Sequence, residues 1–178
     1  MSEQTILHEG RFLRLIKTGT WEYVQRVRAS GAVHIVAVTP DRQLLLVEQH
    51  RVPVGQRVIE LPAGIVGDEA GREAEGANKA AARELVEETG YQPARVERLY
   101  HGPSSPGLSS EVITLVRARD LDQVGPGGGV DGENITVLKV PLDDVPAWLR
   151  ARVDEGRLID HRVYAALYFL GVAEASSD

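Results

Sequence analysis

The chain has 178 residues, is 43% hydrophobic and carries a formal net charge of −6. This length and composition suit one soluble globular domain over 1–178 with a sizeable core. Because there is no cysteine, disulfides and thiol chemistry are excluded, and the acidic balance without a long basic run argues against a nucleic-acid binder.

The sequence also lacks signals for secretion or for a membrane. The first residues, Met1-Ser2-Glu3-Gln4-Thr5, do not show the basic and then apolar pattern of a signal peptide. No apolar run approaches the ~20 residues that a membrane-spanning helix needs. We therefore expect a cytoplasmic protein with no membrane partner.

Apolar and β-branched runs predict short strands in the first third of the chain. The expected strands are 11–16, 21–27, 31–38, 44–48 and 58–61. Thr18-Gly19-Thr20 predicts a turn between the first two, and Pro40-Asp41 predicts a hairpin turn between the next two. Pro62 ends the last strand, and 63–71 is expected to be a loop.

The rest of the chain mixes helices with strands. We expect a helix over 74–89, with Gly90 suited to the position just after its last turn. The glycine-rich stretch 125–132 predicts a mobile loop. Asp143 and Asp160 are predicted N-caps of two further helices. Strands at 96–100, 111–118 and 135–140 and helices at 143–155 and 160–174 complete the pattern. Since strands and helices do not alternate strictly, an α+β fold is predicted.

Three glutamates fall on one face of the helix predicted at 74–89. At about 100° per residue, Glu84, Glu87 and Glu88 lie together, and like charges at this spacing repel by roughly 0.2–0.5 kcal/mol per pair. A positive partner is therefore expected, and a hard divalent cation with oxygen ligands fits best. The alternative is an acidic helix that faces solvent.

Together with Glu75, this stretch completes the pattern E-x7-R-E-x-x-E-E-x-G, which resembles the metal-binding box of the Nudix family. The resemblance implies a mixed β-sheet sandwiched between helices (α/β/α) and hydrolysis of nucleoside diphosphates linked to another group. It also implies that Glu84, Glu87 and Glu88 bind Mg²⁺, with Mn²⁺ as a possible substitute. Arg83 would orient the glutamates by pairing with one of them.

The segment before the box narrows the resemblance. Gln49-His50-Arg51 and the run Glu60-Leu61-Pro62-Ala63-Gly64 are similar to the ADP-ribose pyrophosphatase branch, although Pro-Ala-Gly alone is also an ordinary turn. The resemblance implies that the carbonyl of Ala63 binds the metal. Arg51 would contact the diphosphate of the substrate, and Glu60 would support the metal network.

Two positions after the box carry further implications of the same resemblance. Pro106, sixteen residues after Gly90, marks the ADP-ribose branch, and Glu111 is a weaker candidate on the metal side. Glu133 matches a glutamate on a mobile loop that closes over the substrate and activates water, a role for which Glu87 competes. Without the resemblance, these residues would be a rigid surface loop and a solvated hairpin tip.

The N-terminal strands resemble animal ADP-sugar pyrophosphatases at Thr20-Trp21-Glu22 and at Arg26. There the tryptophan stacks on adenine and the arginine approaches the ligand from the neighbouring subunit. A homodimer formed through about 10–30 is therefore implied, with Trp21, Glu22 and Arg26 as substrate-binding residues. The alternative is a tryptophan in the core. Asp160-His161-Arg162 also matches these enzymes and is interpreted as structural.

The chain departs from the family pattern at one place. Ten residues separate Gly64 from Glu75, where the box normally has five, so the loop entering the helix is lengthened within 67–74. The metal ligands lie outside this insertion. The role of Glu75 in bracing the site is less secure.

The combined reading is a Mg²⁺-dependent hydrolase that cleaves ADP-ribose, a small nucleotide sugar, to AMP and ribose 5-phosphate. Two alternatives remain open. One is a Nudix enzyme for another ADP-sugar, GDP-mannose or an oxidised nucleotide. The other is a Nudix-fold protein that senses ADP-ribose without cleaving it.

Overall fold

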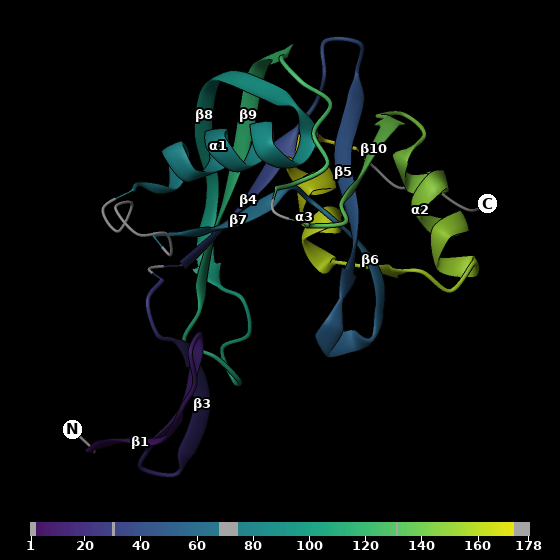
Figure 1. The fold of residues 1–178 in the computed structure, drawn as a ribbon. Helices are drawn as coiled ribbons and strands as arrows, with labels where there is room; N and C mark the ends of the chain where they lie inside the picture. The colour runs from purple at the N-terminus through teal and green to yellow at the C-terminus, as the bar shows by residue number, and fades with distance from the viewer. Residues whose placement is uncertain (1–2, 30, 68–74, 131, 173–178) are drawn as a thin grey trace.

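The computed structural model describes residues 3–29, 31–67, 75–130 and 132–172 (Figure 1). Its strands are β1 (Gln4–Glu9), β2 (Leu13–Thr18), β3 (Trp21–Arg26), β4 (Gly31–Ala37), β5 (Gln43–Arg51), β6 (Gln56–Glu60), β7 (Ala63–Val66), β8 (Tyr91–Pro103), β9 (Val112–Gln123), β10 (Thr136–Pro141) and β11 (Leu158–Ile159). The helices are α1 (Ala77–Thr89), α2 (Val145–Asp154) and α3 (His161–Leu170), with a short 3₁₀ turn at Val52–Val54. Among the described residues, no helix is both long and apolar enough to span a membrane.

The first three strands form a separate antiparallel sheet, the N-terminal arm, which projects from the rest of the molecule (Figure 1). The sequence predicted β2 and β3 but missed β1, because all six residues of β1 are exposed and give no alternating pattern. Val24 ties the arm to the body. Its N–H donates to the Leu108 carbonyl at 2.9 Å, and its carbonyl accepts from Ser110 N–H at 3.0 Å.

The body contains two four-stranded sheets, ordered β7-β4-β9-β8 and β10-β5-β6-β11. Both are mixed, since β4 pairs parallel to β9 and β6 parallel to β11. The hairpin predicted around Pro40-Asp41 is therefore only partly right. Thr39 N–H donates to the Gln43 carbonyl and closes the turn, but β4 and β5 share only the bridge Val38–Leu44 before they diverge into different sheets.

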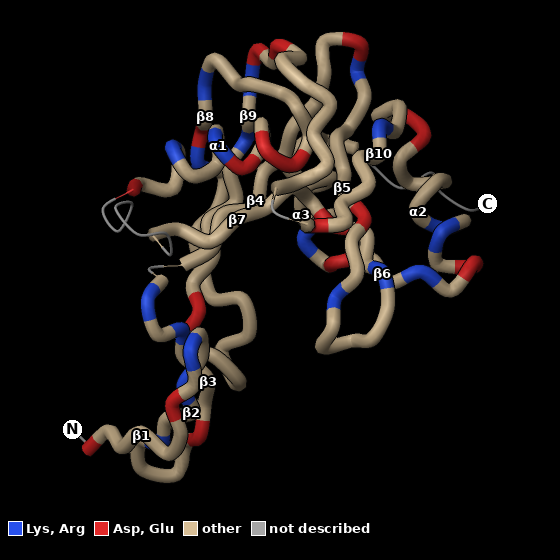
Figure 2. The backbone as a smooth tube through the Cα atoms, viewed as in Figure 1, with Lys and Arg blue, Asp and Glu red and all other residues tan. Residues whose placement is uncertain are grey.

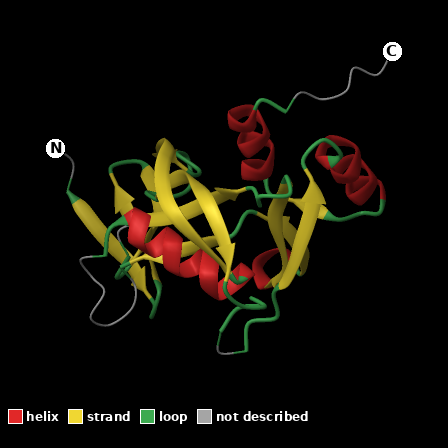
Figure 3. Ribbon diagram, turned by 90° about the horizontal axis from the view of Figure 1, so that it is seen from above, coloured by secondary structure: helices red, strands yellow, loops and turns green. Residues whose placement is uncertain are grey.

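The central strands are buried on both faces, which explains their nearly unbroken apolar sequences. In β4, Val33 and Ile35 pack with Leu85 of α1, whereas Val36 packs with residues of α2 and α3. Alternate side chains of β5 divide in the same way. Helix α1 thus lies on one side of the strands and α2 with α3 on the other (Figure 3), so the predicted α+β fold between helices is confirmed.

Several predicted boundaries were wrong. The loop expected at 63–71 begins with the edge strand β7, and α1 starts at Ala77 after Gly76. The N-cap of α2 is Asp144, whereas Asp143 pairs with Arg42 at 2.9 Å. Asp160 does cap α3, accepting the Arg162 N–H at 2.8 Å. Most of the proposed insertion, 68–74, lies outside the described residues.

The glycine-rich segment is packed against the end of α1. Gly128 and Gly129 donate their N–H groups to the carbonyls of Glu88 and Glu87, at 2.8 and 3.0 Å. Such carbonyls at a helix end otherwise need water or another partner. Gly90 has φ +76°, and a Cβ there would lie 2.1 Å from the Gly125 carbonyl oxygen, so this close approach requires glycine. The glycine-rich segment, which was predicted to be mobile, is thus held against the end of α1 by backbone hydrogen bonds.

Candidate active site

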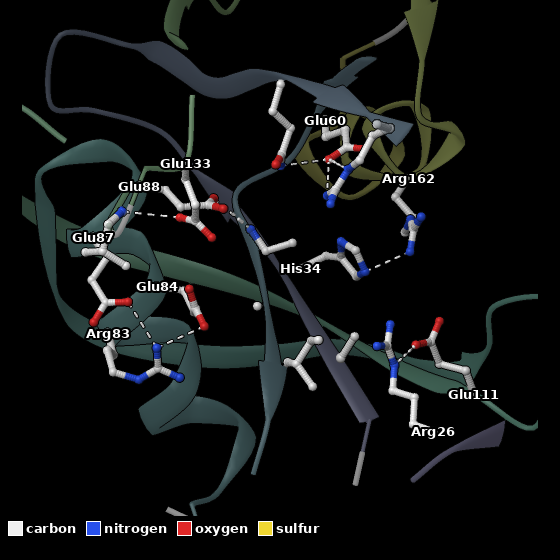
Figure 4. A pocket seen from close by; sticks show the side chains of 17 residues that line it. Arg26, His34, Glu60, Arg83, Glu84, Glu87, Glu88, Glu111, Glu133 and Arg162 are labelled. Atoms are coloured by element: carbon white, nitrogen blue, oxygen red, sulfur yellow. Dashed lines mark hydrogen bonds and ion pairs between the residues drawn. The ribbon is translucent and has the colours of Figure 1, made fainter. Parts of the chain in front are cut away.

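A pocket of about 430 Å³ opens between α1, the strands β4 to β7 and α3. Most of the residues predicted for the site line it: Arg26, Arg51, Glu60, Ala63, Arg83, Glu84, Glu87, Glu88, Glu111 and Glu133. Figure 4 shows the box glutamates on one side of the pocket and the pairs Arg26–Glu111 and His34–Arg162 on the other. The pocket therefore has an acidic wall and a basic wall.

Arg83 organises the acidic wall. Its Nη1 donates to Glu84 at 2.9 Å and to Glu87 at 3.0 Å, and its Nη2 donates to Glu75 at 3.2 Å. The guanidinium thus supplies a positive partner for the clustered glutamates. The sequence predicted that Arg83 pairs with one of the box glutamates, and in the structure it pairs with two. Glu75 braces this arginine despite the longer loop before it.

Glu88 joins the helix to the edge strand β7. Its carboxylate accepts the Ala63 N–H at 3.1 Å, and the side chain is only 5% exposed. Ala63 lies opposite His34, next to the hydrogen-bonded pair made by Ile35 N–H and the Pro62 carbonyl. In an antiparallel ladder, the residue beside such a pair directs its N–H and carbonyl away from the partner strand. The Ala63 carbonyl therefore faces the open edge of the sheet, as a metal ligand there would.

Gly64 allows this close contact between β7 and α1. A Cβ at Gly64 would lie 2.1 Å from the carboxylate of Glu84. Any larger residue would push the helix carboxylate away from the strand. The glycine thus helps to place Glu84 and the Ala63 carbonyl at the same wall of the pocket.

Burial raises the pKa of both carboxyl groups nearest the strand. The pKa of Glu84 rises to about 7, although Arg83 opposes the shift, and that of Glu88 rises to about 8, although the Ala63 N–H opposes it. Carboxylates that are costly to ionise without a cation, beside a main-chain carbonyl, form an all-oxygen donor set that suits a hard divalent ion.

The described carboxylates do not yet converge on an ion. No group of three acidic or histidine side chains, within the described ranges, is arranged to hold a metal. The reason is visible in the contacts, because Glu84 and Glu87 both point to Arg83. Arg83 thus holds both carboxylates at the pocket, on the helix that also carries Glu88.

The basic wall consists of arginines that are each paired with a carboxylate. Arg51 pairs with the buried Glu60, with Nε–Oε1 at 2.9 Å and Nη2–Oε2 at 2.5 Å. Arg26 pairs with Glu111 at 2.6 Å. Glu60 and Glu111 therefore hold arginines in this structure. Arg26 also lines the pocket of its own chain, whereas the resemblance implied that it contacts the ligand of a neighbouring subunit.

Sequence reasoning missed His34 and underrated Arg162. His34 is 9% exposed on β4 and its Nε2 accepts a hydrogen bond from Arg162 Nη1 at 2.7 Å. Burial, reinforced by Arg162, lowers the pKa of His34 to about 3, so the imidazole is neutral. One signal was available, because His34 is a polar residue inside an otherwise apolar run of β4.

Three predicted substrate residues lie outside the pocket of their own chain. Trp21 and Glu22 are exposed on β3 of the N-terminal arm, with Trp21 at 62%. Pro106 lies in the turn that Leu108 N–H closes on the Ser105 carbonyl, which also supports the arm. Trp21 is thus not a core residue of this chain.

The raised carboxyl pKa values predict a pH-dependent stability of the metal-free protein. The folded state holds protons on Glu84 and Glu88 more tightly than the unfolded chain, whose reference pKa is 4.5. The free energy of unfolding therefore falls as pH rises from about 4.5 through 7 and 8. Urea unfolding in EDTA at pH 5 and 8.5 measures this, and the double variant Glu84→Gln, Glu88→Gln should show a smaller difference. Equal pH differences in both proteins would contradict the assignment.

Comparison with known proteins gives one family. The NUDIX domain model matches residues 29–161. The methanol dehydrogenase activator of Bacillus methanolicus and the ADP-ribose pyrophosphatase of Bacillus subtilis are 32% and 31% identical over 150 residues, covering 84% of this chain and 76% of each relative. The mouse ADP-sugar pyrophosphatase is 32% identical, covering 99% of this chain and 88% of the relative.

A solved structure shares the fold. The crystal structure of an ADP compounds hydrolase superposes with a TM-score of 0.62 at 20% identity, covering 80% of each chain. The family model spans most of the chain, including the box helix, the edge strand β7 and the histidine of β4. With relatives of this identity and coverage, the chain belongs to the Nudix family of hydrolases.

Proposed function

We propose that this protein hydrolyses ADP-ribose to AMP and ribose 5-phosphate with Mg²⁺. The observation that carries the proposal is the division of one pocket into carboxylates on α1 and arginines on the facing strands. A diphosphate bridged to a metal needs both, because the ion binds oxygen ligands and the arginines offset the remaining phosphate charge. The relatives named for ADP-ribose and ADP-sugars support the choice of substrate.

Nudix hydrolases generally use divalent metal ions, and the residues here fit one. Glu84, Glu87, Glu88 and the Ala63 carbonyl would hold it, and when bound it would neutralise the diphosphate and lower the pKa of a water. Arg83 orients the glutamates through its contacts with Glu84 and Glu87. The arginines of the basic wall hold the phosphate oxygens in position for attack.

Glu133 is our choice for the base that takes the proton from the attacking water. It lines the pocket and its carboxylate accepts the Val130 N–H at 3.3 Å. Within the described residues, no arginine or lysine pairs with it. Glu87, by contrast, is held by Arg83 at 3.0 Å, so its carboxylate is already engaged in an ion pair.

We also propose that a homodimer completes the site. The arm exposes large apolar side chains, including Ile6 at 51%, Phe12 at 68% and Trp21 at 62%. Apolar residues gathered on one small projecting sheet favour burial against another surface. Because Trp21 lies outside the pocket of its own chain, a role in stacking on adenine requires the pocket of a partner copy.

A substrate panel tests the function. With Mg²⁺, ADP-ribose should be cleaved faster than GDP-mannose or nucleoside triphosphates, releasing AMP and ribose 5-phosphate. Glu84→Gln and Glu88→Gln should each lower kcat by about 100-fold or more while the fold survives, because a metal-binding charge is lost and the helix is kept. Glu97→Gln, which removes the exposed partner of Arg119, is the matched control. Near-normal activity in the box variants would exclude the metal assignment, and intact ADP-ribose after long incubation would favour the sensor alternative.

The two candidate bases are distinguished by comparing kcat and Mg²⁺ dependence in parallel. Glu133→Gln should lower kcat strongly, by about 100-fold as for a lost general base, with almost unchanged apparent Mg²⁺ affinity. Glu87→Gln should weaken both, because its carboxylate is proposed to hold the ion. If Glu133→Gln retains most of its turnover, the base is Glu87 or a metal-bound hydroxide.

Trp21→Ala tests the arm. Loss of stacking should raise KM by about 5- to 100-fold, equivalent to roughly 1–3 kcal/mol, with a smaller effect on kcat. Sedimentation should give a dimer for the wild type. A monomer with full activity, or a normal KM for Trp21→Ala, would exclude the proposed role of the partner copy.

A further inference from the structure

A chain of polar side chains runs from α3 into the pocket. Asp160 accepts hydrogen bonds from Arg162, with Nε–Oδ1 at 2.7 Å and Nη2–Oδ2 at 2.5 Å. Arg162 in turn donates from Nη1 to His34 Nε2 at 2.7 Å. Figure 4 shows His34 between the box glutamates and Arg162, so the chain ends in the middle of the pocket.

The contact with Arg162 determines where His34 carries its proton. A guanidinium donates hydrogen bonds and never accepts them, so Nε2 of His34 must be the unprotonated nitrogen. The proton of the neutral ring then lies on Nδ1. Arg162 thereby converts a histidine that could donate from either nitrogen into a donor from Nδ1 alone.

The position of His34 would put this donor beside a diphosphate bound in the pocket. His34 lies directly opposite Ala63 in the ladder between β4 and β7. Side chains of directly opposite residues lie on the same face of a sheet and in contact range. A substrate held at the Ala63 carbonyl and the box glutamates therefore lies next to the imidazole.

The net charge of Asp160, Arg162 and His34 together indicates which kind of substrate atom His34 would bind. Asp160 neutralises Arg162 through two hydrogen bonds, and His34 is uncharged, so the three side chains together carry no net charge. Phosphate oxygens are bound most strongly by charged donors such as a guanidinium, whereas the group that His34 offers is a neutral N–H. A neutral N–H donor suits an uncharged oxygen, such as a sugar hydroxyl.

We propose that His34 Nδ1–H donates a hydrogen bond to a sugar hydroxyl of the nucleotide-sugar substrate, with Arg162 and Asp160 as positioning residues. The role rests on the hydrolase function proposed above. Asp160-His161-Arg162, which the sequence analysis interpreted as structural, would then also help to bind substrate through Asp160 and Arg162. His161, whose side chain is 73% exposed, is not part of it.

Two matched substitutions separate donor from acceptor. The amide nitrogen of asparagine is as many bonds from Cα as Nδ1 of histidine, and the amide of glutamine is as many as Nε2. His34→Asn therefore keeps a donor at the Nδ1 position, whereas His34→Gln keeps the acceptor for Arg162 and loses that donor. His101→Gln is the control, since it removes a similar contact, Nδ1 to Thr114 Oγ1 at 3.0 Å, outside the pocket.

The experiment measures KM and kcat for ADP-ribose, the Ki of inorganic pyrophosphate, and the Tm. His34→Gln should raise KM by about 3- to 10-fold, the size of one neutral hydrogen bond, with kcat nearly unchanged. His34→Asn and His101→Gln should keep the KM of the wild type. The Ki of pyrophosphate, which has no sugar, should stay constant in all variants.

Three results obtained with the variants would overturn the proposal. Equal increases of KM in His34→Asn and His34→Gln that follow a lower Tm would assign His34 to packing alone. A raised Ki for pyrophosphate would assign the donor to a phosphate oxygen. An unchanged KM in His34→Gln would show that the proposed hydrogen bond from His34 to the sugar is not made. If the wild type cleaves a different nucleotide sugar, the proposed substrate ADP-ribose is wrong, and the KM ratios of variant to wild type are measured with the sugar that is cleaved. A wild type that neither cleaves nor binds any nucleotide sugar overturns both this proposal and the proposed function.

Discussion

The close approach of α1 to the edge strand β7 is the constraint on which the site depends. Gly64 leaves room for the Glu84 carboxylate, and the Ala63 N–H binds Glu88. These contacts bring acidic side chains and a main-chain carbonyl to the same wall. They exist only because β7 is an edge strand, whose outer N–H and carbonyl groups are not used by another strand.

Several charged side chains of the pocket are held in ion pairs with one another. Arg83 holds Glu84 and Glu87, Glu60 holds Arg51, and Asp160 holds Arg162. Buried charges are tolerated only when they are paired. A diphosphate bound as proposed would therefore meet the carboxylates of α1 on one side and N–H donors on the other. Figure 2 shows that residues of both signs are also scattered along the rest of the chain, for example in the N-terminal arm.

The two projecting or glycine-rich segments are positioned by a few backbone contacts. Gly128 and Gly129 bind the carbonyls at the end of α1, which brings Glu133 to the pocket rim. Val24 alone carries the described ladder contact between the arm and the 108–110 turn. Segments held by few contacts open at low cost in free energy, which is consistent with the roles proposed for this loop and for the arm.

The sequence predicted the box helix, the clustering of its glutamates and the α+β class, because helical spacing and apolar runs are local properties. It could not separate β4 from β5 into two sheets, since both runs are equally apolar and pairing is decided by the strands that arrive later in the chain. Nor could it predict β1, whose residues are all exposed, or the hydrogen bonds that hold the glycine-rich segment against α1. Only the tertiary structure brought His34 together with Arg162, 128 positions away, because a hydrogen bond between distant residues leaves no spacing pattern in the chain.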